Sequence, residues 1–93
     1  MDLELEMQLN ELKKDLIADM RNLEKIVSDD LGERVFEILL LIWGMVVSER
    51  LSTYQKISSL LNGLLVESID QAFKAKIAAH VATLNDRLIP MLK

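Results

Sequence analysis

Hydrophobic side chains recur along the first third of the chain at the spacing of a helix with one apolar face. Their gaps alternate irregularly between three and four residues from position 5 to position 27, which is close to coiled-coil spacing. The side chains of this seam are Leu5, Leu9, Leu12, Leu16, Met20, Leu23 and Val27. The pattern predicts a first helix over residues 3–28, either as a short coiled-coil strand or as the edge helix of a bundle.

The most apolar part of the chain comes next, where residues 35–47 read VFEILLLIWGMVV. On a helical wheel at about 100° per residue, the polar and small positions form one narrow stripe. That stripe contains Glu33, Glu37, Gly44 and Ser48. An ordinary surface helix needs an apolar face only somewhat wider than about 100°. The pattern therefore predicts a second helix over residues 31–50 that requires neighbours on several sides.

Two further helices are predicted over residues 53–62 and 69–89. Ser52 favours a bend or break at the start of the first of these, and the pair Asn62-Gly63 favours a turn at its end. Pro90 should end the last helix, because proline lacks the N–H that continues the hydrogen-bond ladder. The sequence contains no sustained alternation of apolar and polar residues, so it predicts no strand.

These elements predict an all-α fold, namely a small antiparallel bundle of three to four helices in one domain over residues 1–93. One chain gives the second helix only two or three neighbours, so we expect homodimerisation through an isologous interface to complete the bundle. Polar substitution at Leu39 or Trp43 should then disrupt assembly, whereas Glu37 should tolerate it. The predicted interface residues are Val35, Phe36, Leu39, Trp43 and Val46.

Length and composition argue against a membrane span and against thiol chemistry. The uncharged run over residues 38–47 gives about 15 Å of helix, against a hydrocarbon core of about 30 Å. The chain has no cysteine, which excludes disulfides and zinc–thiolate sites. Together with an acidic N-terminus, this composition favours a cytoplasmic protein.

Charge is unevenly distributed along the chain. Residues 1–37 carry eleven acids and five bases, a net charge of −6, whereas residues 38–93 carry four acids and six bases, a net charge of +2. An acidic first helix argues against direct nucleic-acid binding. Glu11, Asp15 and Asp19 recur at four-residue spacing and are a candidate surface for a basic protein partner. A plain solvated helix face explains the same spacing.

Candidate chemistry is sparse, and no cofactor or metal site is predicted. His80 is the only histidine and lies at the edge of the last predicted apolar seam, which is typical of a structural role. The chain contains no Gly-rich phosphate loop, nucleophile elbow or HExxH motif. Its arginines, Arg21, Arg34, Arg50 and Arg87, are scattered along the sequence.

The sequence thus favours a non-enzymatic, regulatory interaction module: an adaptor, a chaperone-like factor or a small inhibitor that acts as a helical homodimer and binds a protein partner. Besides a peripheral membrane or pore-forming protein that exposes the second helix on insertion, two alternatives stay open at this stage. One is an all-helical dimeric enzyme of the chorismate-mutase size class, which would need several converging bases around an anionic substrate. The other is an acidic inhibitor that mimics nucleic acid.

Overall fold

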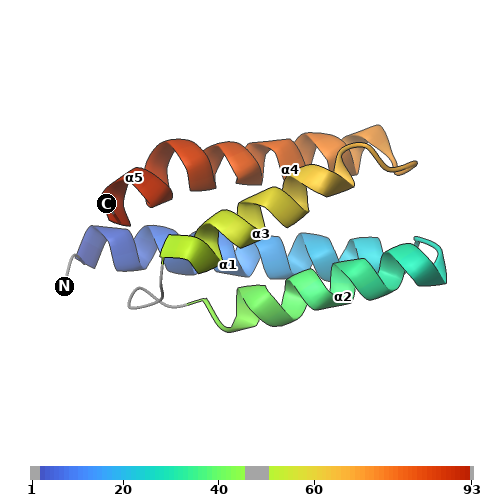
Figure 1. The fold of residues 1–93 in the computed structure, drawn as a ribbon, viewed down its shortest axis with the longest axis horizontal. Coiled ribbons are helices and arrows are strands. Elements are labelled where there is room, and N and C mark those ends of the chain that lie inside the picture. The colour runs from blue at the N-terminus through green and yellow to red at the C-terminus, as the bar shows by residue number, and fades with distance from the viewer. Residues whose placement is uncertain (1–2, 46–50, 93) are drawn as a thin grey trace.

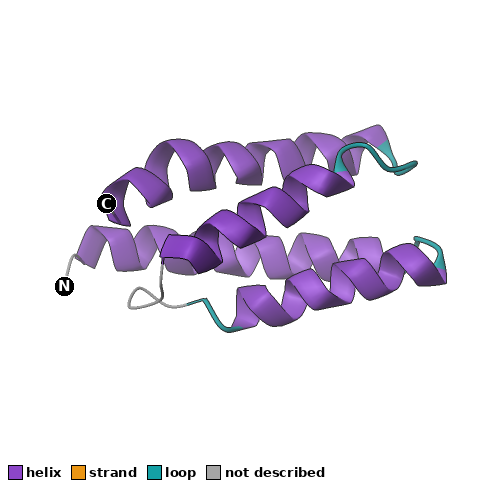
Figure 2. Ribbon diagram, viewed as in Figure 1, coloured by secondary structure: helices purple, strands orange, loops and turns teal. Residues whose placement is uncertain are grey.

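The computed structural model describes residues 3–45 and 51–92, and every regular element in this part of the chain is a helix (Figure 2). This confirms the predicted all-α class. Four helical segments follow one another, and the last of them is continuous through a π-helical turn. The elements are α1 (Leu3–Glu24), α2 (Asp29–Trp43), α3 (Leu51–Leu64), α4 (Gln71–Thr83), the π-turn η1 (Leu84–Leu88) and α5 (Ile89–Leu92).

The helices form an elongated bundle in which each runs opposite to the one before it (Figure 1). The packed pairs are α1 with α2, α2 with α3, α3 with α4, and α4 with α1. The principal-axis extents are 40 × 21 × 20 Å, so the bundle is one helix long and two helices wide. One face of each helix therefore points toward a shared central core, and the opposite face points outward.

The core confirms the predicted seam of the first helix. Six of its seven positions, from Leu5 to Leu23, are buried, and Val27 lies in the turn that follows α1. Tyr54 is the one aromatic residue in the buried core, so the centre of the bundle is mainly aliphatic. The other helices contribute Val35, Ile38, Leu39, Ile42, Ile57, Leu61, Leu64, Ile77, Leu84, Leu88 and Ile89.

The first two helices are shorter than the sequence predicts. α1 ends at Glu24, and α2 ends at Trp43, well before position 50. Gly44 is the C-cap of α2, and the Nζ of Lys13 in α1 donates to the Met45 carbonyl oxygen at 3.0 Å. A side chain from a neighbouring helix thus satisfies a carbonyl next to the end of α2, a contact between distant residues that helical periodicity cannot predict.

The N-terminus of α4 is capped by a different residue from the one the sequence suggests. Ser68 with Gln71 resembles a capping box, but the N-cap is Asp70. Its Oδ1 accepts a hydrogen bond from the Ala72 backbone N–H at 2.8 Å. The helix consequently begins at Gln71, two residues after the predicted start.

Pro90 does not end the last helix, contrary to prediction, because a π-turn precedes it. The Ile89 N–H donates to the Leu84 carbonyl oxygen, five residues back, and the helix then runs through Pro90 to Leu92. The wider turn alters the approach of the proline ring to the preceding carbonyls, which is the clash that stops a regular α-helix. The buried Ser58 hydroxyl of α3 also donates to Asn85 Oδ1 in this turn at 2.8 Å.

Candidate interaction surface

The apolar residues of α2 divide between two faces of the helix. One face enters the core through Val35, Ile38, Leu39 and Ile42. On the other face, Phe36 and Trp43 are each 43% exposed and Leu40 is 51% exposed. We call these three residues the α2 outer row. Their spacing of four and then three residues places them along one side of the helix, where the bundle leaves them uncovered.

The structure narrows the predicted dimer interface. Val35 and Leu39 are 0% and 1% exposed within one chain, so they hold the monomer together and offer no surface to a second chain. A polar substitution at Leu39 would therefore unfold the chain, not only disrupt assembly. Phe36 and Trp43 are accessible, as an interface requires, whereas Val46 lies outside the described residues.

Leu40 was not among the predicted interface residues, although the sequence contained a signal for it. It lies four residues after Phe36 and three before Trp43, which is the spacing of neighbours on one helix face. The helical wheel does not single out Leu40 as an interface residue, because nearly every position in this part of the chain is apolar. Only the positions of the other helices decide which apolar residues face inward.

Gly44 follows the outer row and is not required by the fold. Its φ is −82°, which any residue adopts. A Cβ at this position would make ordinary contacts, 3.6 Å from the Leu41 carbonyl oxygen and 3.8 Å from that of Leu40. We therefore expect Gly44→Ala to raise the free energy of unfolding of the monomer by about 0.4–1 kcal/mol, because alanine restricts the unfolded chain. Urea denaturation of dilute protein measures this change, and a loss of stability would contradict it.

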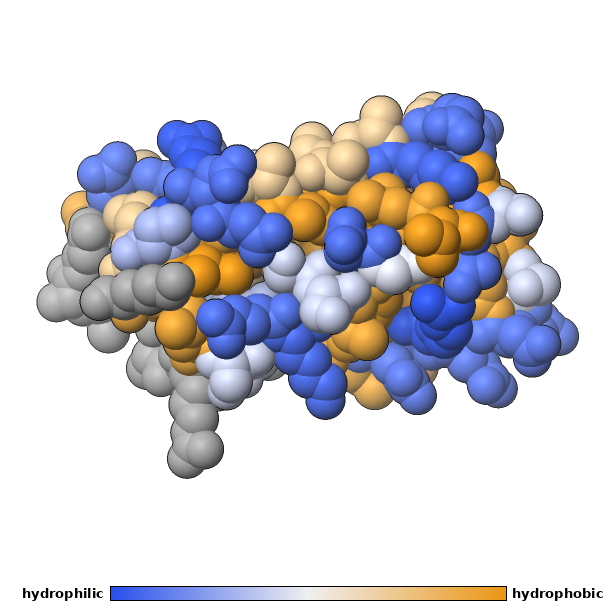
Figure 3. All heavy atoms as spheres, turned by 45° about the horizontal axis from the view of Figure 1, so that its top comes forward, coloured by the Kyte–Doolittle hydropathy of each residue, from blue (hydrophilic) through white to orange (hydrophobic). Residues whose placement is uncertain are grey.

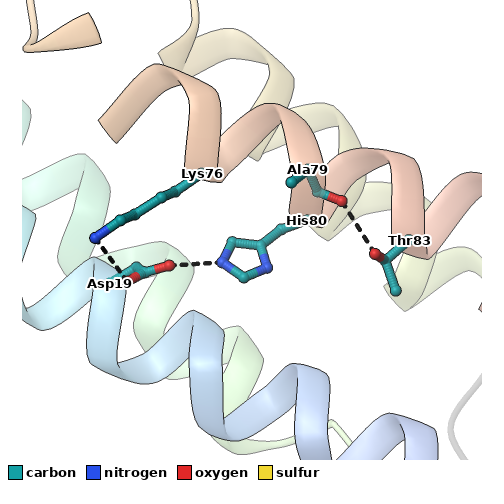
Figure 4. Close-up of polar contacts among 5 residues, drawn as sticks. All are labelled: Asp19, Lys76, Ala79, His80 and Thr83. Atoms are coloured by element: carbon teal, nitrogen blue, oxygen red, sulfur yellow. Dashed lines mark hydrogen bonds and ion pairs between the residues drawn. The ribbon is translucent and has the colours of Figure 1, made fainter. Parts of the chain in front are cut away.

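The three acids predicted as a partner surface have different environments. Glu11 and Asp15 are exposed, but the Asp19 side chain is only 17% exposed. Asp19 Oδ2 accepts a hydrogen bond from His80 Nε2 at 2.7 Å, and its Oδ1 lies 4.0 Å from the Nζ of Lys76 (Figure 4). Asp19 thus links α1 to α4, and two of the three acids remain open to a partner.

His80 lies at the boundary between α1 and α4 with 13% of its side chain exposed. Its ring reaches from α4 toward Asp19, while the Thr83 hydroxyl one turn on donates to the Ala79 carbonyl oxygen at 3.0 Å (Figure 4). Among the residues that the structure describes, no group of three or more His, Cys, Asp or Glu side chains could hold a metal ion. The geometry assigns His80 a contact between helices, in agreement with the structural role that the sequence favours.

Three hollows in the described part of the chain are lined by basic side chains, the feature that the enzyme alternative requires of a substrate pocket. Arg34 forms an ion pair with Glu67 across a hollow near the α1–α2 and α3–α4 turns. Arg87 and Lys76 line separate hollows between α1 and α4. Each of these hollows contains one Lys or Arg, whereas a dianionic substrate calls for several.

The outer surface elsewhere is mixed in polarity. Figure 3 shows one face on which hydrophilic residues lie between the hydrophobic patches. Among the described residues, no helix is both long and apolar enough to cross a membrane. Large exposed apolar side chains also occur on α1, at Leu3 and Met7, and α2 carries three of them along one side.

Comparison of the chain with protein-family models, curated proteins and solved structures found no match.

Proposed function

We propose that this protein is a non-enzymatic interaction module that forms a homodimer through the α2 outer row and binds a protein partner in that form. The observation that carries the proposal is the exposure of Phe36, Leu40 and Trp43 beside a core that is complete without them. Aromatic side chains are enriched at protein interfaces and often dominate their energetics. Trp43 and Phe36 provide two such anchors about two helical turns apart.

The size of the row sets the strength of association that we expect. Three side chains at 43–51% exposure present roughly 300 Å² per chain, taking about 200 Å² for each complete side chain. A standard interface buries about 800 Å² per partner. Flanking residues must supply the remainder, so we expect a dimer with a dissociation constant in the micromolar range, about −8 kcal/mol.

Sedimentation velocity over a range of protein concentrations tests this proposal. Phe36→Ser should weaken dimerisation about tenfold or more, because it removes an apolar anchor worth at least about 1.4 kcal/mol. Ile26→Ser is the matched control, since Ile26 is 62% exposed but lies in the turn after α1. It should leave the dissociation constant unchanged. Both variants should retain the helical circular dichroism of the parent protein.

Trp43 provides a second readout of the same event. It is the only tryptophan and is 43% exposed, so burial in a dimer should shift its fluorescence emission to shorter wavelength as the protein concentration rises. Phe36→Ser should move that transition to higher concentration. A protein that stays monomeric into the high micromolar range, or an Ile26 variant that dissociates as readily as the Phe36 variant, would contradict the proposal.

The surface that we propose for the protein partner is the exposed acidic part of α1. Glu11 and Asp15 remain exposed on α1 and line a hollow beside α4, where they would suit a basic segment of another protein. The mimicry of nucleic acid gains no support, because Asp19 is already engaged by His80 and Lys76. The carboxylates of Glu11, Asp15 and Asp19 are therefore not equally open to a partner.

A further inference from the structure

We propose that the two chains pair their α2 helices in antiparallel orientation, with Leu40 against Leu40 at the twofold axis and Phe36 of each chain against Trp43 of the other. This inference depends on the proposed function, because it specifies the arrangement of that same dimer. In this arrangement the α2 outer row packs against the same row of a second copy of the chain. The positions, the bulk and the charges of the residues around Leu40 support it.

The residues on both sides of Leu40 are arranged almost symmetrically along α2. At about 100° and 1.5 Å per residue, Phe36 lies about 40° to one side and about 6 Å before Leu40. Trp43 lies about 60° to that same side and about 4.5 Å after it. Glu37 and Gly44 lie on the opposite side of Leu40. Glu37 is about 60° to that side and precedes Leu40, and Gly44 is about 40° to that side and follows it. The face is therefore nearly symmetric in position, with both aromatic residues along one edge.

An antiparallel twofold axis uses this symmetry. It brings together residues that share an edge but lie on opposite sides of Leu40 along the helix. Phe36 then meets Trp43 of the second chain twice, which gives two identical aromatic contacts. Gly44 lies opposite Glu37, where its lack of a side chain leaves room for the carboxylate stem. The small residue that the fold does not require thus lies where close approach is needed.

A parallel twofold axis gives poorer contacts with the same residues. It brings together residues at the same height on opposite edges, so Phe36 would lie against Glu37 and Trp43 against Gly44. Each Phe36 would then be covered in part by a carboxylate, and the aromatic residues would not meet. Burying a charge beside an apolar side chain is unfavourable without a partner for it.

The distribution of charge along α2 favours the same orientation. The acids Asp29, Asp30, Glu33 and Glu37 all lie in the first half of the helix, and residues 38–45 carry no charge. The ammonium group of Lys13 lies at the far end, on the Met45 carbonyl oxygen. Antiparallel pairing places the acidic half of each helix toward the partner's Lys13, whereas parallel pairing places two acidic halves together. Charge complementarity of this kind selects the orientation of an interface.

Disulfide cross-linking tests this arrangement directly, because the chain has no cysteine of its own. A disulfide requires Cα atoms within about 7 Å. Each cysteine variant is oxidised at a concentration at which sedimentation shows that variant itself to be dimeric, because the substitutions weaken the dimer. Leu40→Cys should then form a cross-linked dimer. Phe36→Cys should form about tenfold less, since two copies of position 36 would lie about 12 Å apart along the helices. Ile26→Cys, exposed in the turn after α1, measures cross-linking by random collision.

A mixture of two variants completes the test. Chains carrying Phe36→Cys and chains carrying Trp43→Cys should cross-link to each other more than either does to itself, and mass spectrometry distinguishes the mixed product. Efficient self-cross-linking of Phe36→Cys would overturn the antiparallel arrangement and leave the dimer itself standing. Cross-linking of Leu40→Cys at only the Ile26 level, while the Leu40→Cys variant is itself dimeric in sedimentation, would do the same. Absence of dimer in sedimentation would instead overturn the proposed function and this inference together.

Discussion

Leu39→Ala should destabilise the monomer by about 2–5 kcal/mol, the usual range for removing a buried leucine from a packed core. Leu40→Ala, one residue along the same helix, should change monomer stability by at most about 0.5 kcal/mol. Leu39 is 1% exposed and Leu40 is 51% exposed. Leucine and alanine have similar helix propensities, so the difference between the two variants reports burial alone.

Urea denaturation followed by circular dichroism measures both changes, at a protein concentration low enough to keep the chain monomeric. Sedimentation at high concentration measures the effect of Leu40→Ala on dimerisation. There, Leu40→Ala should weaken dimerisation, because it removes the residue proposed for the twofold axis. Equal destabilisation of the monomer by both substitutions would show that the assignment of the two faces of α2 is wrong.

This pair of leucines also shows how far the sequence predicts the fold. The seam of the first helix was predicted residue by residue, because polar positions separate its apolar ones and leave one face to bury. In α2 the apolar residues surround most of the helix, so the sequence predicts burial without a direction. The helices α1 and α3 pack against one side of α2, so Val35 and Leu39 are buried in the core. Phe36 and Trp43 remain partly exposed on the other side.

Other differences from prediction have the same origin in contacts between distant residues. Lys13 reaches the end of α2 from 32 positions away, and the Ser58 hydroxyl reaches Asn85 from 27 positions away. Helical periodicity carries information over one or two turns and contains no signal for either contact. The π-turn before Pro90 likewise goes against the local rule that a proline ends a helix.

The contact between Asp19 and His80, 61 positions apart, makes the acidic residues of α1 unequal. Asp19→Ala should lower the free energy of unfolding by about 1–3 kcal/mol, because it leaves a largely buried imidazole N–H without its acceptor. Asp15→Ala is the matched control, one turn earlier on the same helix and exposed. It should change stability by at most about 0.5 kcal/mol. Asp19→Asn should retain part of the stability, since its amide oxygen can accept the same hydrogen bond.

Lys76→Ala separates the two contacts that Asp19 makes. The Lys76 side chain is 57% exposed and its Nζ lies 4.0 Å from Asp19 Oδ1, and exposed pairs of this kind contribute at most about 1 kcal/mol. Urea midpoints of the four variants should therefore place Asp19→Ala well below the parent protein, with Lys76→Ala and Asp15→Ala close to it. Equal effects at Asp19 and Asp15 would mean that the carboxylate of Asp19 acts only as surface charge. The three acids would then form one face available to a basic partner, as their spacing alone suggests.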